Sequence, residues 1–130
     1  MRKPRANPEA RLQIDVKQYL TLCLPDDIKW TASLTGTHLS IRAATRAKAM
    51  GVRRGWPDLS FLFPDGVTRF IELKTATGSL SPEQRDFRDA AKPHGVWAVC
   101  RSVDEVEVQL RLWGARLRNH PFRDSLEEAA

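Results

Sequence analysis

The sequence predicts an α/β fold in one domain, a small mixed β-sheet flanked by helices. A chain of 130 residues suits a single hydrophobic core. Helix-type and strand-type apolar spacings follow one another in the order α-β-α-β-β-α-β-α, which is typical of this class. A Pro-Asp-Gly turn at 64–66 joins two of the strands into a hairpin. The domain is expected over residues 8–119, with a flexible basic arm at 1–7 and a tail at 120–130.

The first half of the chain predicts two helices and one strand. Apolar residues recur at every third or fourth position of the first helix, and Pro8 suits its first turn. The strand alternates in polarity and is rich in β-forming residues. The second helix is rich in alanine and arginine, and Gly51 lies just past its end, where a left-handed cap is favoured. The expected ranges are 9–22, 28–32 and 40–50.

The second half predicts a hairpin, a helix, a strand and a last helix. Ser81 and Gln84 have the spacing of a capping box, so a helix should begin at Pro82. The run 96–100 is short and continuously apolar, as in a buried central strand. Ser102 caps the last helix. The hairpin strands are expected at 59–63 and 67–73, and the third helix should end near residue 91.

Composition favours an anionic partner and excludes some classes of protein. Lysine and arginine number 21 against 16 acids, a net charge of +5. No apolar stretch approaches the ~20 residues of a membrane span. Since no apolar run follows the basic start of the chain, a cytoplasmic location is expected. Cys23 and Cys100 have no cysteine or histidine at ligand spacing, so both should be buried, reduced thiols.

The positive charge is concentrated in one acid-free segment, residues 29–56. Arginine predominates there, and its guanidinium group binds phosphate through two hydrogen bonds. For any single residue, a solvated basic surface is the alternative explanation. The candidate DNA-binding residues are Arg42, Arg46, Lys48, Arg53 and Arg54.

The hairpin brings two carboxylates together. A three-residue turn pairs Asp58 with Glu72, and a two-residue turn shifts the pairing by one position. Glu72 and Lys74 project from the same face of their strand. Two close carboxylates repel unless a cation lies between them, and hard oxygen ligands suit Mg²⁺ or Mn²⁺. None of these three side chains is expected to belong to the buried core.

Two sets of motifs carry a resemblance to known nucleases. Pro57-Asp58, followed by Glu72-Leu73-Lys74, resembles the PD-(D/E)xK nuclease superfamily. The wider context, residues 51–59, the Glu-Leu-Lys motif, residues 78–84 and Gly95 before a strand, resembles the VRR-NUC (virus-type replication-repair nuclease) domain. This resemblance extends over roughly residues 8–110 and implies a restriction-endonuclease-like core.

The resemblance also implies roles for individual residues. Asp58 and Glu72 would bind Mg²⁺ or Mn²⁺, and Lys74 would be the catalytic lysine, holding or deprotonating the attacking water. The backbone carbonyl of Leu73 would be an additional metal ligand. Glu9 would reach the metal directly or through water, although an acid in the first turn of a helix is also favoured by the helix dipole alone.

Further family positions have structural alternatives. Gln84 would orient the phosphate or the water, but a capping box with Ser81 explains it equally well. Asp15 competes with Glu9 and lies on the helix face opposite the apolar stripe. Trp56 could stack on a base, with a place in the core as the default. The glycines at 51 and 55 would allow close approach to the DNA backbone, and capping or a tight turn also explains them.

These observations favour a metal-dependent DNA endonuclease that hydrolyses phosphodiester bonds. Stand-alone members of the family resemble structure-selective enzymes of the Holliday-junction-resolvase type. Branched DNA is therefore the expected substrate, and a symmetrical junction suits a two-fold homodimer. The alternative is a nucleic-acid-binding module that keeps the fold without catalysis.

Overall fold

The structure is a computed structural model that describes residues 7–33 and 40–118. The fold is built around a four-stranded mixed sheet. The expected arm at 1–7, apart from Asn7, and the expected tail at 120–130 lie outside these ranges. The elements follow the predicted order with one short 3-10 helix added. They are α1 (Pro8–Cys23), β1 (Lys29–Ala32), α2 (Ile41–Ala49), β2 (Leu59–Leu62), β3 (Thr68–Leu73), α3 (Pro82–Ala91), η2 (Lys92–His94), β4 (Trp97–Cys100) and α4 (Val103–Leu112).

Strand pairing confirms the hairpin and shows which of the two possible registers it has. The sheet order is β1-β2-β3-β4, with β1, β2 and β3 antiparallel and β4 parallel to β3. Leu59 lies opposite Ile71 and Leu62 opposite Thr68, which is the register of a three-residue turn. Continued by one position, this register sets Asp58 against Glu72.

β4 is an edge strand in the described sheet, so its predicted central place is wrong. Its apolar run has another cause: α4 packs against β4 on one side and α3 on the other. Trp97 and Cys100 are buried although one edge of the strand has no described neighbour. Apolar residues on both faces of a strand indicate that helices cover both faces, and they do not indicate whether other strands pair with both edges.

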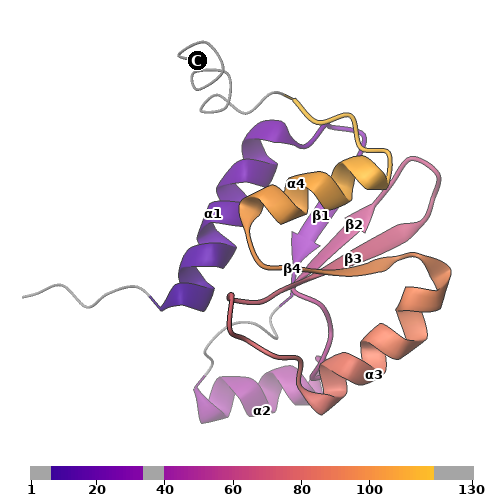
Figure 1. Ribbon diagram of the computed structural model, residues 1–130. Helices are drawn as coiled ribbons and strands as arrows, with labels where there is room; N and C mark the ends of the chain where they lie inside the picture. The colour runs from indigo at the N-terminus through magenta and orange to yellow at the C-terminus, as the bar shows by residue number, and fades with distance from the viewer. Residues whose placement is uncertain (1–6, 34–39, 119–130) are drawn as a thin grey trace, which may run out of the picture.

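Helices lie on both sides of the sheet (Figure 1). α1 and α4 lie together on one side, and α3 lies on the other with α2 beyond it. The core fills the α1–α4 side, where Val16, Leu20 and Leu110 pack against Phe61 and Ile71, all at most 1% exposed. Because side chains alternate along a strand, the neighbours of Ile71, which are Phe70 and Glu72, point to the α3 side.

Local capping explains where the helices begin. Side-chain oxygens of Asn7, Ser40, Ser81 and Ser102 accept hydrogen bonds from backbone N–H groups in the first turns of α1, α2, α3 and α4. The capping box of α3 is complete, as predicted. Gly51 follows α2 with φ +98°, the left-handed conformation that its position predicts.

Both cysteines are buried free thiols, as expected. Burial raises the pKa of Cys100 to about 12 and raises that of Cys23 as well. Both therefore remain protonated and unreactive at neutral pH.

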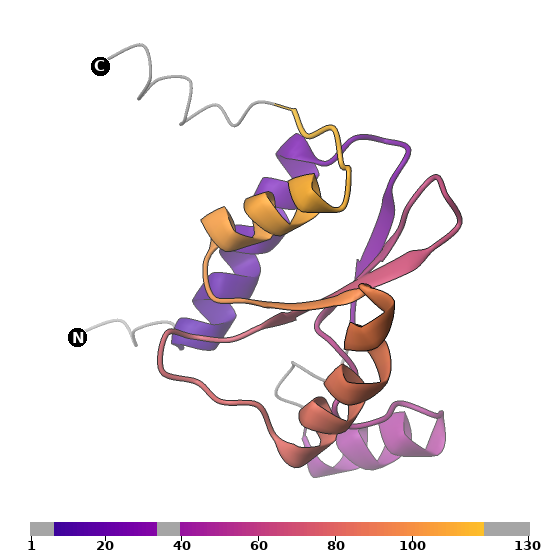
Figure 2. The same ribbon diagram turned by 45° about the vertical axis from the view of Figure 1, so that its right-hand side comes forward.

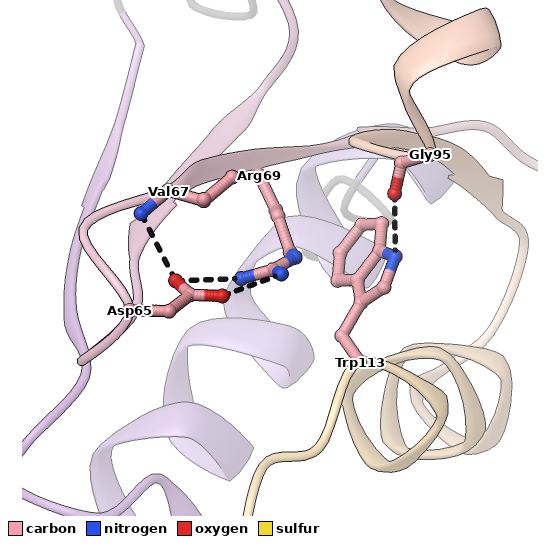
Figure 3. Close-up of polar contacts among 5 residues, drawn as sticks. All are labelled: Asp65, Val67, Arg69, Gly95 and Trp113. Carbon is pink, nitrogen blue, oxygen red and sulfur yellow. Dashed lines mark hydrogen bonds and ion pairs between the residues drawn. The ribbon is translucent and has the colours of Figure 1, made fainter.

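A polar and aromatic network holds the outer part of the hairpin (Figure 3). The Arg69 guanidinium donates to both carboxylate oxygens of Asp65, over 2.8 and 3.2 Å, and holds the pKa of that carboxyl below its usual range. The guanidinium carbon also lies 4.4 Å from the centre of the Phe63 ring. Phe63 packs edge-on against Trp113, whose indole N–H donates to the Gly95 carbonyl over 3.0 Å. The hairpin is thus tied to the end of α4, away from the carboxylate pair.

α2 lies at the end of the molecule opposite the hairpin turn, beside α3 in both views (Figures 1 and 2). None of its residues is buried, although Ala43 and Ala47 are partly covered. Its charged side chains are therefore available to a partner. Among the described residues, no helix has the length and apolar character needed to cross a membrane.

Candidate active site

A pocket of about 1180 Å³ lies where the two predicted carboxylates meet. Its walls come from the start of α1, from α2 and the segment that follows it, from the end of β3, and from the start of α3. Segments distant in the sequence therefore converge on one hollow. The sequence-predicted residues in its lining are Glu9, Lys48, Arg53, Arg54, Trp56, Asp58, Glu72, Leu73, Lys74 and Gln84.

Asp58 and Glu72 form the buried part of the pocket. Their exposed fractions are 8% and 2%, so the expectation that none of Asp58, Glu72 and Lys74 is buried is wrong for these two, while Lys74 is half-buried. Beside them the segment before β2 packs against the start of α3, where Gly55 approaches the Glu83 backbone. Asp58 Oδ2 accepts a hydrogen bond from the Leu73 backbone N–H over 2.7 Å, which fixes the carboxylate beside the end of β3.

Glu72 carries a buried oxygen whose hydrogen-bonding capacity is unused. Its Oε1 accepts from the Gln84 side chain, while its Oε2 accepts no hydrogen bond from the described residues and can pair with the Asp58 carboxyl only through a shared proton or a cation. Burial, and then the negative charge of Asp58, raise the pKa of Glu72 to about 9, against an ordinary value of 4.5. The positive charge of Lys74, which lines the same pocket, opposes this rise in the pKa of Glu72. A cation bound at Oε2 would satisfy the oxygen and relieve the repulsion.

Gln84 completes the capping box, one of the two functions that its sequence position allowed, and it also binds Glu72, which the sequence did not predict. Its Oε1 accepts from the Ser81 backbone N–H over 2.8 Å, and its backbone N–H donates to Ser81 Oγ over 3.2 Å. Its Nε2 donates to Glu72 Oε1 over 3.0 Å. The capping box therefore locks the amide in the orientation that holds the Glu72 carboxylate, and its polar atoms are engaged by the protein rather than directed at a phosphate.

α1 contributes Glu9 to the pocket rim. Glu9 is exposed in the first turn of the helix, lines the pocket, and its charge adds to the pKa rise of Glu72. Gln13, one turn further along, lines the pocket as well. The competing Asp15 pairs with Arg11, over 3.4 Å between Nε and Oδ1, and does not line the pocket. The structure thus brings Glu9, and not Asp15, to the site.

The basic candidates divide into two groups. Lys48, Arg53 and Arg54 line the pocket and have exposed side chains. Arg42 and Arg46 are exposed on α2 but do not line it. A phosphate held in the pocket would contact the first group, and only DNA extending past α2 would reach the second.

Trp56 is not a core residue, contrary to the default expectation. Its side chain is 44% exposed and lines the pocket. Its ring packs edge-on against Phe87 and Phe70, with centroids 4.9 and 5.8 Å apart. These contacts fix the segment before Asp58 to α3.

Gly55 is required by close packing. A Cβ atom there would lie 2.5 Å from the backbone carbonyl carbon of Glu83, and the backbone has φ +82°. Gly51 has a similar φ of +98°, but nothing lies within 4 Å of the corresponding Cβ position. The structural explanations, a tight approach at Gly55 and a helix cap at Gly51, account for both glycines.

Gly55→Ala is expected to destabilise the protein by about 2–4 kcal/mol, because a strained φ and a backbone clash add together. Gly51→Ala is the matched control, since it carries the same conformational strain without the clash. Thermal melts of the two variants measure the difference. Equal losses of stability would show that the approach of Gly55 to α3 is not the constraint.

Sequence reasoning missed Arg101, which follows β4. Its Nη1 donates to the backbone carbonyls of Thr75 and Gly78, both over 2.7 Å, and so holds the loop between Lys74 and α3. An arginine after a strand belongs to none of the recognised motifs, and no signal in the sequence links it to a loop more than twenty residues earlier.

The side chains present fit a divalent cation such as Mg²⁺. Across residues 7–33 and 40–118, no group of three or more His, Cys, Asp or Glu side chains is arranged to hold a metal. Mg²⁺ does not need such a cage, because it commonly uses one or two carboxylates and completes its shell with water and substrate phosphate. Asp58, Glu72 and the unpartnered Glu72 Oε2 meet that requirement at the base of an open pocket.

Comparisons with known proteins agree with this architecture. A solved structure described as a VRR_NUC domain is 22% identical, with a TM-score of 0.52 over 82% of this chain and 97% of that one. A second, described as a VRR_NUC domain protein, is 21% identical, with a TM-score of 0.56 over 85% and 91% of the two chains. These likenesses confirm the restriction-endonuclease-like α/β fold.

A search of the curated proteins found no match. The family model of the VRR-NUC domain matches residues 11–104, which include the pocket from Leu12 of α1 to Gln84 of α3. Because this match covers well over half of the sequence, the chain belongs to the VRR-NUC family of nuclease-type domains.

Proposed function

We propose that the protein is a metal-dependent endonuclease that hydrolyses phosphodiester bonds in DNA. The observation that carries the proposal is the buried pair of Asp58 and Glu72, with one carboxylate oxygen unpartnered, at the base of a pocket. Lys48, Arg53 and Arg54 on the pocket lining suit the phosphates of a nucleic acid. The acidic side chains thus lie at the base of the pocket, where a cation can bind, and the basic side chains lie on its lining, where the phosphates of a nucleic acid can bind.

Each residue has a role in this proposal. Asp58 and Glu72 hold the cation, Mg²⁺ or Mn²⁺, with the Leu73 carbonyl and Glu9 as further ligands. The bound cation supplies Lewis-acid chemistry at the scissile phosphate.

The remaining residues orient and activate. Gln84 orients Glu72 through the hydrogen bond between Nε2 and Oε1. Lys74 lines the same pocket, where its ammonium can hold the attacking water by donating a hydrogen bond to the water oxygen, and its positive charge favours release of the water's proton to bulk solvent. Gln84 is thus assigned to the carboxylate instead of the phosphate.

A non-catalytic DNA-binding module is the alternative function, and the burial of the acids argues against it. Two adjacent buried carboxylates destabilise a fold and repel the phosphates that such a module must bind. Both effects are unfavourable for a module that only binds DNA. Hydrolysis gives both carboxylates a use as cation ligands.

Branched DNA is the proposed substrate, and a homodimer is the assembly that suits a symmetrical junction. Family resemblance and the exposed basic helix α2, which extends the positive surface beyond the pocket, support this part of the proposal. Cleavage of linear, flapped and four-way DNA, each with Mg²⁺, Mn²⁺ or Ca²⁺, tests substrate and metal together. No cleavage of any substrate with any of these cations would contradict the endonuclease proposal, and equal rates on all would remove the selectivity.

The two basic groups should behave differently. The double variants Arg53→Ala/Arg54→Ala and Arg42→Ala/Arg46→Ala are each expected to weaken binding to all DNA sequences alike. The slope of log K against log[salt] should fall by about 0.9 for each lost phosphate contact. The first pair lines the pocket, so its loss should also lower turnover at saturating DNA, whereas the second should affect affinity alone. Equal effects on turnover would show that the phosphate path has been placed wrongly.

A further inference from the structure

Arg101 stands outside the pocket but is tied to the loop that joins two of its walls. It follows β4 directly, and the ladder between β3 and β4 continues to its neighbour, where the Lys74 N–H donates to the Cys100 carbonyl over 3.1 Å. Its own backbone N–H donates to the Glu105 carboxylate over 3.3 Å at the start of α4. Arg101 is therefore anchored to the sheet and to α4 before its side chain reaches the loop.

The guanidinium closes a turn. The Gly78 N–H donates to the Thr75 carbonyl over 3.1 Å, and Arg101 Nη1 donates to the carbonyls of both residues over 2.7 Å. These short, charge-assisted hydrogen bonds are stronger than neutral ones. Both ends of the turn are thus held by one side chain.

This turn lies between two functional groups of the pocket. Before it is Lys74, whose Cδ would lie 3.5 Å from a Cβ atom placed on Gly78, so the lysine side chain passes close over the turn. After it is Ser81, whose capping box locks the Gln84 amide that holds Glu72. Displacement of the turn would move the Lys74 ammonium and the Glu72 carboxylate relative to each other.

We propose that Arg101 is a positioning residue for the cleavage reaction, acting through the turn at 75–78 on Lys74 and Gln84. This inference rests on the proposed nuclease function. Arg101 does not line the pocket, and its Nη1 is engaged by two backbone carbonyls, so its contacts in the structure are with the turn. Small displacements of groups that orient a reaction lower its rate strongly while leaving substrate affinity nearly unchanged.

The test compares Arg101→Met with Arg116→Met on DNA that the wild type cleaves. Arg116 is exposed and does not line the pocket, so its variant loses the same charge without touching the turn. At a temperature where all three proteins are folded, Arg101→Met is expected to lower kcat roughly ten- to a hundredfold, with KM and the salt dependence of binding unchanged. Hydrogen exchange at the Gly78 amide should become faster in Arg101→Met alone.

Other outcomes separate the possibilities. A kcat within about twofold of wild type would overturn the positioning role. A rise in KM with a shallower salt slope would overturn it too, because that pair marks a lost phosphate contact. A wild-type chain that cuts no DNA would overturn the nuclease proposal and this role with it, whereas an active wild type with an equally active Arg101→Met overturns the role alone.

Discussion

Asp58→Asn, Glu72→Gln and Lys74→Met are each expected to lower the cleavage rate by at least about a thousandfold, because each removes a charged group that acts at the scissile phosphate. Single-turnover cleavage at saturating DNA measures the loss. DNA binding should remain, since the phosphate contacts proposed for Lys48, Arg53 and Arg54 are untouched. A variant that cuts at the wild-type rate would remove its residue from the site.

The two carboxyl variants also predict a change in stability that separates catalysis from folding. Asp58 and Glu72 are buried side by side, so a neutral amide in place of either removes a repulsion and a desolvation cost. Without metal, Asp58→Asn and Glu72→Gln should therefore melt at or above the temperature of the wild type while losing activity. A lower melting temperature in both would instead indicate that the pair is a structural element.

Removal of divalent cations by a chelator is expected to stop cleavage, and addition of Mg²⁺ or Mn²⁺ is expected to raise the melting temperature of the protein. A ligand that binds only the folded state at a hundred times its Kd stabilises it by about 2.7 kcal/mol. Asp58→Asn, which removes one of the two buried charges, should lose most of this rise. Glu9→Gln should lose a smaller part of the rise in melting temperature, because Glu9 lines the pocket from its exposed rim.

The rise in melting temperature should depend on pH in a defined direction. The folded-state pKa of Glu72 is raised to about 9 from an ordinary value of 4.5. An acid with a raised folded pKa contributes stability that is complete below its unfolded pKa and is lost as pH rises through the folded value.

The metal-free protein should therefore become less stable across that window. A cation replaces the proton, so its stabilising effect should be larger at about pH 8 than at about pH 6. Equal rises at the two pH values would show that the cation binds away from Glu72.

Local chemistry in the sequence predicted most of the fold. The turn at 64–66 predicted the hairpin to within one position of its register, and the structure has the three-residue turn that sets Asp58 against Glu72. Ser81 and Gln84 predicted the start of α3. Both depend on residues close in the sequence, where spacing determines geometry. The place of β4 did not follow in this way, because an apolar run records which faces are covered and contains no information about which edge is paired.

The sequence predicted which residues form the candidate site, but it did not predict their burial or their contacts. The motif named Asp58, Glu72 and Lys74, but it did not predict that Asp58 and Glu72 are buried, nor that the segment before β2 packs against the start of α3 beside them. The bond from Gln84 to Glu72 likewise joins a helix to a strand and leaves no periodic trace in the sequence. Contacts of this kind arise from tertiary packing, which spacing alone does not encode.

The two pairings of β3 have a consequence for the order in which the site assembles during folding. The antiparallel pairing with β2 closes through a short turn, an event on the scale of ~1–10 μs in isolated hairpins, whereas the parallel pairing with β4 must wait for the intervening helix. The carboxylates therefore meet early, and the contacts made by Gln84 and Arg101, across 12 and up to 26 residues, come later. A chain with its hairpin formed and its crossover still open would hold Asp58 and Glu72 close together in water, where their repulsion is weaker, without the groups that orient them. Closure of the crossover would complete the proposed catalytic arrangement, so the appearance of the proposed cleavage activity should mark the end of folding.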